Sequence, residues 1–282
     1  MSETDTIPRA LTIAGSDSGG GAGIQADLKT FAAFGVYGTS AVAAVTAQNT
    51  LGVGNWLAMP ADLVGEQIDA VLSDIGATAV KTGMLANAAI VSATASALRR
   101  HDAGPIVVDP VIVSSSGRQL LDGDGVDALI RALLPLAHVV TPNLPEAEAL
   151  TGQSIRSWED AKAAARRLVD MGARSAVITG GHFDDPANAT DLYFDGESFR
   201  DFTAVRVDTK NTHGTGCTFS AAIAAGLARG MKTADAIALA KSYVTLAMQH
   251  AYPIGDGAGP LHHFYRYWQP AGRRYRPGVA PR

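Results

Sequence analysis

The chain has 282 residues and carries 23 Lys and Arg against 27 Asp and Glu, which gives a formal net charge of −4. This mildly acidic balance argues against binding to nucleic acid or to an anionic membrane surface. The single cysteine, Cys217, excludes an intramolecular disulfide and a zinc cluster built from cysteines. With 47% hydrophobic residues, the composition is typical of a folded globular chain and not of a disordered one.

No targeting segment is apparent in the sequence. Residues 1–5 are polar and acidic, without the basic and apolar stretches of a secretory signal. The longest apolar stretches, such as residues 41–47, fall short of the ~20 residues that a membrane helix needs. We therefore expect a cytoplasmic protein with no membrane span, and the single thiol of Cys217 agrees with a reducing compartment.

Runs of β-branched residues alternate with alanine-rich, helix-favouring segments along most of the chain. In chain order, the pattern predicts a strand at 10–14, a helix at 23–34, a strand at 39–47, a helix at 61–73, a strand at 79–82, a helix at 88–100, a strand at 105–109, a helix at 126–134, a strand at 139–140, helices at 146–150 and 159–171, a strand at 176–179, a hairpin of strands at 191–194 and 198–202, and helices at 217–229 and 233–250. Pro60 marks the start of the second helix, and Asn87 is expected to cap the third.

This alternation predicts an α/β fold in which helices cover both faces of a mostly parallel sheet. The hairpin predicts a small antiparallel edge on that sheet. No linker rich in Pro, Gly and Ser divides the chain, and we find no internal repeat. We therefore expect one domain over residues 1–282, with flexible ends at 1–8 and 270–282.

A glycine-rich loop from Gly15 to Gly23 separates the first strand from the first helix. Such a loop allows close backbone approach to a ligand and directs amide groups at it. The loop has no Lys and so is not a Walker A motif, and the dinucleotide fingerprint that it partly fits lacks an acid after the second strand. Asp17, Asp27 and Gln48 are suited instead to hydrogen bonding with a small polar heterocycle. A tight turn without a ligand is the structural alternative.

A second glycine motif, Gly214-Thr215-Gly216-Cys217, opens a long alanine-rich helix. The amides of Gly214, Gly216 and Cys217 at a helix N-terminus predict an anion hole for a phosphoryl group in transfer. Cys217 would lie at the positive end of the helix, where the pKa of a thiol tends to fall, and could accept a proton from a substrate hydroxyl. A small buried hydrophobe is the alternative role for this cysteine.

Both motifs resemble those of the hydroxymethylpyrimidine kinase / phosphomethylpyrimidine kinase family of thiamine biosynthesis. The first resembles it from Gly15 to Thr30 and the second from Lys210 to Cys217. Shorter matching segments occur in the family's order at 47–50, 83–85, 108–111, 141–147, 180–182 and 259–264. The resemblance covers about residues 10–268, and it implies a ribokinase-like three-layer α/β/α sandwich. It also implies phosphorylation of 4-amino-5-hydroxymethyl-2-methylpyrimidine by ATP, and of the monophosphate to the diphosphate.

The resemblance assigns roles to individual residues. Those that would surround the pyrimidine are Gln48, Asp27, Gly15 and Val111. The residues of the catalytic segment are Gly214, Thr215, Gly216 and Cys217. Cys217 occupies the position of the catalytic Asp of related sugar kinases, and it is provisionally assigned as the base. Those that would support Mg–ATP are Asp109, Asn143, Glu146, Thr179 and Lys210, with Asp109 and Glu146 as the Mg²⁺ ligands. By spacing alone, Asn143 and Glu146 predict a helix capping box.

Several positions are open to more than one interpretation. Thr179 stands where many family members have Lys, and Ser114-Ser115 replaces Ala-Lys or Ala-Thr, which bears on nucleotide affinity and on the second phosphorylation. Lys81 remains a candidate cation beside Lys210. His213 precedes the anion hole, where it could fix the loop, and the adjacent His262 and His263 are expected to pack near the site.

Two alternative functions remain. A vitamin B6 kinase of the same fold would also phosphorylate a hydroxymethyl group on a six-membered nitrogen heterocycle, although Gln48 and the continuous first motif favour the pyrimidine. The other alternative is a non-catalytic pyrimidine-binding sensor, against which the intact Gly-Thr-Gly-Cys motif argues. The resemblance further implies a homodimer, and the mildly acidic balance predicts no nucleic-acid partner.

Overall fold

All nine strands of the described residues (7–114, 117–180 and 185–267) join one sheet in the computed structural model, in the order β3-β2-β1-β4-β5-β6-β7-β8-β9. Six neighbouring strands run parallel: β2 (Tyr37–Asn49), β1 (Arg9–Asp17), β4 (Ala79–Thr82), β5 (Ile106–Val108), β6 (Ala137–Val140) and β7 (Ala176–Ile178). The strands at the two edges are antiparallel: β3 (Gly52–Ala58) pairs with β2, β8 (Asn188–Phe194) pairs with β7, and β9 (Phe199–Val205) pairs with β8.

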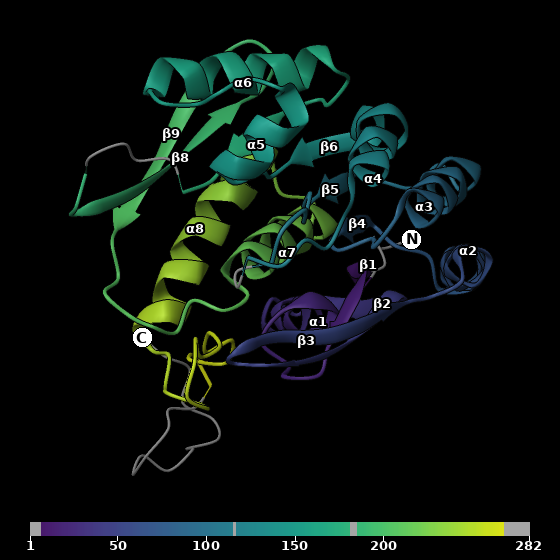
Figure 1. Ribbon diagram of the computed structural model, residues 1–282, viewed down its shortest axis with the longest axis horizontal. Helices are drawn as coiled ribbons and strands as arrows, with labels where there is room; N and C mark the ends of the chain where they lie inside the picture. Colours follow the sequence, from purple (N-terminus) through teal and green to yellow (C-terminus); the bar gives the residue numbers. More distant parts are fainter. Residues whose placement is uncertain (1–6, 115–116, 181–184, 268–282) are drawn as a thin grey trace, which may run out of the picture.

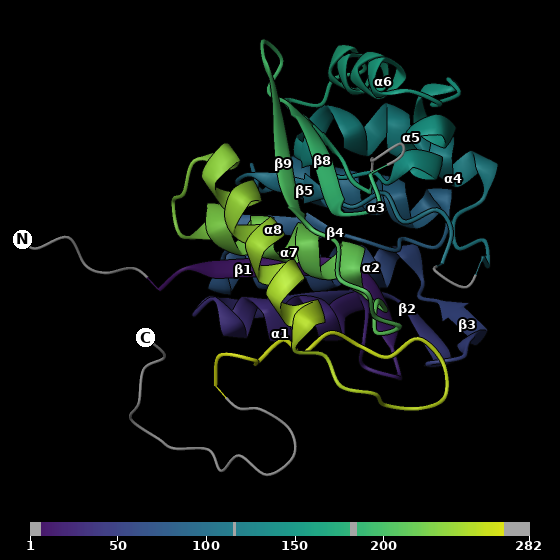
Figure 2. The ribbon, with the colours of Figure 1, turned by 90° about the vertical axis from the view of Figure 1, so that its left-hand side faces the viewer.

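Helices cover both faces of this sheet (Figures 1 and 2). The helices on one face are α1 (Gly23–Ala33), α7 (Thr215–Ala228) and α8 (Thr233–Gln249). Those on the other face are α2 (Ala61–Ala70), α3 (Ala88–Arg100), α4 (Gly123–Ala128), α5 (Leu144–Thr151) and α6 (Trp158–Asp170). Because successive residues of a strand point to opposite faces, Ala10 packs into the first core and Leu11 into the second. The expected three-layer sandwich is confirmed.

The structure differs from the predicted elements in two respects. First, the sequence predicted one antiparallel edge, and strand β3 adds a second. Its segment contains two glycines and no clear alternation of polar and apolar residues, so its extended form comes from pairing with β2. Second, the predicted helices at 61–73 and 126–134 end in π-helical turns, Val71–Ile75 and Leu129–Leu133, after shorter α-helices.

Two further expectations concern the ends of the chain and the presence of a membrane-spanning helix. Of the predicted flexible ends, 1–8 and 270–282, only Ile7 and Pro8 belong to the described residues, and the Pro8 carbonyl accepts a 2.8 Å hydrogen bond from the Tyr37 N–H. None of the helices in the described part of the chain combines the length and the apolarity that a membrane crossing needs.

The segment after α8 returns to the parallel core and holds the loop before α7. The N–H of His213 donates to the Gly259 carbonyl at 3.1 Å, and the Tyr243 hydroxyl donates to the His263 carbonyl at 2.9 Å. The His263 side chain is buried, and its Nδ1 lies 3.5 Å from the hydroxyl of Thr30 on α1. The C-terminal segment therefore ties α1, α8 and the loop before α7 together.

Burial of His263 makes stability depend on pH. Burial above all, helped by the charges of Lys29 and His262, lowers the pKa of His263 to about 4. Its ordinary pKa in the unfolded chain is about 6.5, so the unfolded state binds more protons between these values. We expect the free energy of unfolding to be fully developed above pH ~6.5 and to fall as the pH drops toward ~4.

We expect His263→Leu to flatten this part of the curve, measured by urea unfolding from pH 7.5 to 4.5. The exposed histidine at position 250 supplies the control, as His250→Asn. If His263→Leu kept the wild-type slope, the buried imidazole would not be the titrating group.

Candidate active site

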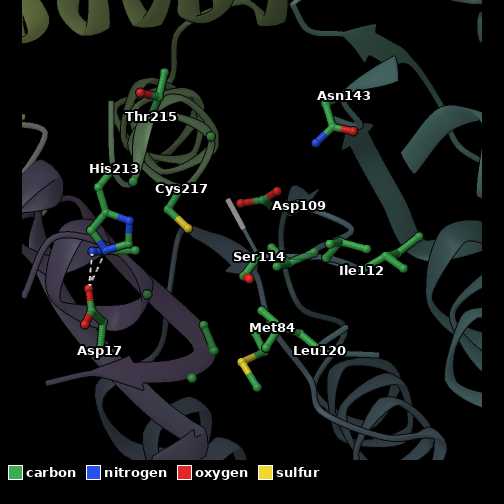
Figure 3. A pocket seen from close by; sticks show the side chains of 18 of the residues that line it. Asp17, Met84, Asp109, Ile112, Ser114, Leu120, Asn143, His213, Thr215 and Cys217 are labelled. Carbon is green, nitrogen blue, oxygen red and sulfur yellow. Dashed lines mark hydrogen bonds and ion pairs between the residues drawn. The ribbon is translucent and has the colours of Figure 1, made fainter. Parts of the chain in front are cut away.

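A cavity of about 540 Å³ opens at the carboxyl ends of the parallel strands (Figure 3). Open α/β sheets bind their ligands at this edge. Its walls come from the ends of β1 and β2, from the loops after β4, β5, β6 and β7, and from the first turn of α7. Segments that are far apart in the sequence thus meet around one space.

Most of the predicted site residues line this cavity: Gly15, Gln48, Asp109, Val111, Asn143, Glu146, Thr179, Gly214, Thr215, Gly216 and Cys217. Two do not: Asp27 is fully buried behind the wall, and Lys210 is exposed on the segment before α7. Ser114 lies in the lining, whereas Ser115 and the Gly181-His182 part of a matching segment fall outside the described residues.

Asp17 folds the glycine-rich loop around its own carboxylate. Its Oδ2 accepts hydrogen bonds from the N–H groups of Gly21 (2.9 Å) and Ala22 (2.8 Å), and its Oδ1 accepts one from Gly19 (2.7 Å). Burial alone would raise the pKa of Asp17, but hydrogen bonds from His213 and from these amides hold it below its ordinary value. The carboxylate of Asp17 therefore fixes the shape of the loop. The sequence predicted only that Asp17 would bind a ligand.

Backbone crowding joins the two glycine motifs at Gly214. This residue has a φ of +82° and caps α7, and a Cβ added to it would overlap the carbonyl oxygen of Gly21. Gly23 is under the same two constraints: its φ is +56°, and a Cβ added to it would overlap the carbonyl oxygen of Gly15. Only glycine fits both positions, because each combines left-handed backbone with direct contact.

The first turn of α7 presents backbone amides to the cavity. The Thr215 N–H donates to the Thr212 carbonyl at 3.2 Å and the Thr218 N–H to the Gly214 carbonyl at 2.9 Å. The N–H groups of Gly216 and Cys217 lie in the first turn, where a helix offers them no carbonyl of its own. Together with the helix dipole, these two amides form a site suited to a phosphoryl oxygen.

A buried lysine lies beneath this turn. Lys81 is 0% exposed, and its Nζ lies 3.0 Å from Asp27 Oδ2 and 3.4 Å from Asp109 Oδ2. Although burial alone would lower the pKa of Lys81, these carboxylates raise it. The Asp27 Oδ2 atom also accepts a 2.6 Å hydrogen bond from the Thr12 hydroxyl, and the Ser220 hydroxyl donates to Asp109 Oδ2 at 3.0 Å.

These contacts correct two expectations. The predicted contact of Asp27 with a substrate does not fit its position, because the side chain is fully buried and pairs with Lys81. Lys81, considered as a cation for phosphate, is instead taken up by the carboxylates of Asp27 and Asp109. Sequence reasoning missed this pairing because the partners are 54 and 28 positions away, and no local pattern links them.

The thiol of Cys217 also differs from its prediction. The sequence predicted a lowered pKa at the helix N-terminus. In the structure, burial raises the pKa of Cys217 to about 12; the Lys81 ammonium opposes this rise, and the charges of Asp109 and Asp27 add to it. Figure 3 shows the sulfur and the Asp109 carboxylate directed toward the same space. The expected lowering was wrong, because desolvation, the largest effect, acts together with two carboxylates to raise the pKa of the thiol.

Asn143 and Glu146 form a capping box at the start of α5, as their spacing predicted. The Glu146 N–H donates to Asn143 Oδ1 at 2.9 Å, and the Asn143 N–H donates to Glu146 Oε2 at 3.0 Å. Burial, followed by the nearby charge of Asp109, raises the pKa of Glu146 to about 8. The capping box thus fixes a carboxyl group that lines the cavity close to a second one.

This pair of carboxyl groups fits a hard divalent cation. Two carboxylates that repel each other gain from a cation between them, and Mg²⁺ prefers such oxygen ligands. Within the described ranges, no group of three or more His, Cys, Asp and Glu side chains is placed to hold a metal ion. A Mg²⁺ ion held by Asp109 and Glu146 would therefore complete its shell with water and phosphate oxygens, as Mg²⁺ commonly does.

The family model for phosphomethylpyrimidine kinase matches residues 17–262 of this chain. A hydroxymethylpyrimidine/phosphomethylpyrimidine kinase of Rhizobium meliloti (strain 1021) is 51% identical over 263 residues, which span 92% of this chain and 98% of that protein. The pyridoxal kinase of Staphylococcus aureus, solved with AMP-PCP and pyridoxal, superposes with a TM-score of 0.83 at 38% identity, over 91% of this chain and 93% of that one.

A phosphomethylpyrimidine kinase of Clostridium difficile 630 superposes with a TM-score of 0.76 at 40% identity, over 85% of this chain and 98% of that one. The solved neighbours confirm the ribokinase-like fold that the sequence predicted. Because the family model matches most of this chain, the chain belongs to the phosphomethylpyrimidine kinase family.

Proposed function

We propose that this chain uses ATP to phosphorylate 4-amino-5-hydroxymethyl-2-methylpyrimidine, and then its monophosphate to the diphosphate, in thiamine biosynthesis. One observation carries the proposal: the Gly216 and Cys217 amides at the start of α7 face the same cavity as Gln48. A phosphoryl-binding site thus shares one space with an amide that can read an aminopyrimidine. The family match and the relatives' names support this substrate.

The remaining site residues divide between the two substrates. Gln48 reads the pyrimidine edge, with Gly15 and Val111 beside it. The side chains that support ATP are Asp109, Asn143, Glu146 and Thr179, and Asp109 and Glu146 would hold Mg²⁺. The metal, when bound, would neutralise charge on the phosphates. Lys210 is exposed and lies outside the lining, so it could reach a nucleotide only after a movement of its loop.

The reaction needs little covalent chemistry from the protein. The substrate hydroxyl oxygen forms a bond to the γ-phosphorus of ATP, the bond from that phosphorus to the bridging oxygen breaks, and ADP leaves with that electron pair. The hydroxyl proton is lost to a nearby acceptor. In a loose transition state, catalysis rests on positioning and on donors for the phosphoryl oxygens, which the α7 amides provide.

Cys217 can be tested as the proton acceptor. Because its pKa lies near 12, the thiol is protonated at neutral pH, and we expect it to position the hydroxyl rather than to act as a resting thiolate base. Cys217→Ser should then keep kcat within about tenfold of wild type, and Cys217→Ala should lose about ten- to a hundredfold. Steady-state kinetics with Mg–ATP would measure both.

A loss of more than about a thousandfold in both Cys217 variants, at unchanged thermal stability, would restore the base role. Cys217→Ser is the informative control because it replaces the thiol with a hydroxyl of similar size at the first turn of α7. A pH profile of kcat adds a check, since a thiolate base would make the rate rise with pH.

The second candidate is a vitamin B6 kinase, and the specific observation in its favour is the superposition on the pyridoxal kinase of Staphylococcus aureus. The test incubates the protein with Mg–ATP and, separately, with the hydroxymethylpyrimidine, its monophosphate and pyridoxal. We expect the pyrimidine to give the highest kcat/KM. Much faster turnover of pyridoxal would overturn the pyrimidine assignment, and binding without any turnover would support the sensor.

Assembly and location are separate proposals. The edge strand β3 and its neighbour β2 expose large apolar side chains, among them Leu57 (72%), Tyr37 (56%) and Val45 (49%). An apolar edge of this kind favours pairing with a second copy, which supports the homodimer. Light scattering would measure the mass, and a monomer at micromolar concentration would contradict it. The free thiol of Cys217 supports a cytoplasmic location.

A further inference from the structure

His213 touches both glycine motifs and the residue that reads the substrate, yet the proposed reaction gives it no task. Its Nε2 lies 2.9 Å from Asp17 Oδ2 and 3.1 Å from the end of the Gln48 side-chain amide. The side chain is only 11% exposed and lines the cavity wall, where Figure 3 shows it above Asp17. The hydrogen-bond roles of these three groups can be worked out from their other partners.

The contact with Asp17 decides which atom of His213 carries a proton. Asp17 Oδ2 already accepts hydrogen bonds from the N–H groups of Gly21 and Ala22, as an ionised carboxylate does. A carboxylate oxygen only accepts, so His213 Nε2 must donate to it. This holds for the neutral ring with hydrogen on Nε2 and for the charged ring alike. Nε2 has one hydrogen and no lone pair left to accept with, so Gln48 shares this hydrogen with Asp17 in a three-centre contact and faces a donor.

Thr46 decides how the Gln48 amide is turned. The Thr46 hydroxyl lies 3.0 Å from the Ser16 carbonyl oxygen and 3.2 Å from the second end of the Gln48 amide. A hydroxyl has one hydrogen, and the Ser16 carbonyl can only accept it. If Thr46 donates to Ser16, it accepts from Gln48, with the NH₂ group of Gln48 toward Thr46 and its carbonyl oxygen toward His213. This reverses the two ends of the amide relative to the structure, which has Gln48 Nε2 beside His213 and Oε1 beside Thr46. The amide nitrogen and oxygen are nearly the same in shape, and this hydrogen-bond logic settles their assignment.

We infer that His213 is a specificity-determining positioning residue, which fixes the order of donor and acceptor that Gln48 presents to the substrate. The inference rests on the proposed function. An amide held in one orientation offers one donor and one acceptor in a fixed order, and an aminopyrimidine edge offers the complement, a ring nitrogen beside an amino group. Pyridoxal carries oxygen substituents and no amino group, so a locked amide pairs with it poorly.

Without the His213 donor, only the Thr46 contact still opposes a turn of the amide, so Gln48 can more easily accommodate either substrate. A buried polar group left unpaired by the wrong substrate costs about 1–3 kcal/mol, and release of the amide removes that penalty. We therefore expect His213→Leu to lower the ratio of kcat/KM for the hydroxymethylpyrimidine to that for pyridoxal by about tenfold. The change should come mainly through KM, because the His213 side chain contacts Asp17 and Gln48 and is expected to act on substrate binding.

Two variants separate this role from a purely structural one. His213→Gln places an N–H donor near the position of Nε2 and should restore the wild-type ratio. Thr46→Val removes the acceptor for the Gln48 NH₂ group, leaves the His213–Asp17 contact intact, and should lower the ratio as His213→Leu does. The measurements are kcat and KM for both substrates with Mg–ATP, together with thermal unfolding of each variant.

The inference is overturned if His213→Leu and Thr46→Val both keep the wild-type ratio, or if His213→Gln loses the ratio as fully as His213→Leu does. A loss confined to kcat would also overturn it. Thr46→Val keeps the experiment decisive if His213→Leu does not fold. A wild-type protein that phosphorylates neither substrate would instead overturn the proposed function, a result visible before any variant is made.

Discussion

Lys81→Met is expected to lower the free energy of unfolding by about 3–5 kcal/mol, the cost of leaving buried carboxylates without their cation. Lys81 is completely buried, and its ammonium lies between Asp27 and Asp109. Methionine fills a similar volume but cannot neutralise either group. We also expect turnover to fall, because Asp109 lines the cavity and depends on the same ammonium. Urea unfolding at pH 7.5 would measure the loss of stability.

The double variant Asp27→Asn with Lys81→Met provides the matched comparison. The amide introduced at position 27 would still accept the hydrogen bond from the Thr12 hydroxyl but would carry no charge, so part of the lost stability should return. Lys210→Met is the control for losing a lysine, since this exposed side chain should change stability by no more than about 0.5 kcal/mol. A double variant as unstable as Lys81→Met alone would show that the charge of Asp27 is not the cause.

Gly214→Ala is expected to reduce kcat/KM by about a hundredfold or more. The added Cβ would meet the Gly21 carbonyl, and relief requires the glycine-rich loop and the first turn of α7 to separate. Both segments line the cavity, and a shift of about 1 Å between reacting groups can cost about 10²-fold in rate. The left-handed backbone at φ +82° adds a further cost of about 1–2 kcal/mol for any residue with a Cβ.

Gly230→Ala separates the effect of backbone strain at a positive φ from the effect of the contact between a Cβ and the Gly21 carbonyl. Gly230 has a φ of +78°, almost the same backbone, but a Cβ there would meet open space beyond the end of α7. We expect this variant to lose about 1 kcal/mol of stability and to keep wild-type kinetics. If Gly230→Ala were as inactive as Gly214→Ala, the contact between Gly214 and Gly21 would not be what holds the site together.

Local patterns in the sequence were sufficient for most of the fold. Short β-branched runs predicted the parallel strands, and Asn143 with Glu146 predicted the capping box of α5. Strand β3 was missed because its extended form depends on pairing with β2. Glycine motifs predicted where the cavity wall would form, since close backbone approach demands glycine at Gly214 and Gly23.

Electrostatic properties of the site were much harder to predict. Asp27 follows the glycine-rich loop in the sequence, but its helix turns it away from the cavity and toward Lys81. The pKa of Cys217 was expected to fall because helix position is visible in a sequence, while burial and distant carboxylates are not. Such properties depend on neighbours brought together by the sheet, so they follow from tertiary structure alone.

The hydrogen bond from the His213 N–H to the Gly259 carbonyl has a consequence for protein synthesis. A ribosome makes the chain from its N-terminus, so β1, β2 and the glycine-rich loop exist before the first turn of α7 is translated. The segment that holds His213 is made later still. A nascent chain that stalls before residue 259 would therefore contain the nine described strands and every residue that lines the cavity, but it would lack the Gly259 carbonyl that holds the backbone of His213.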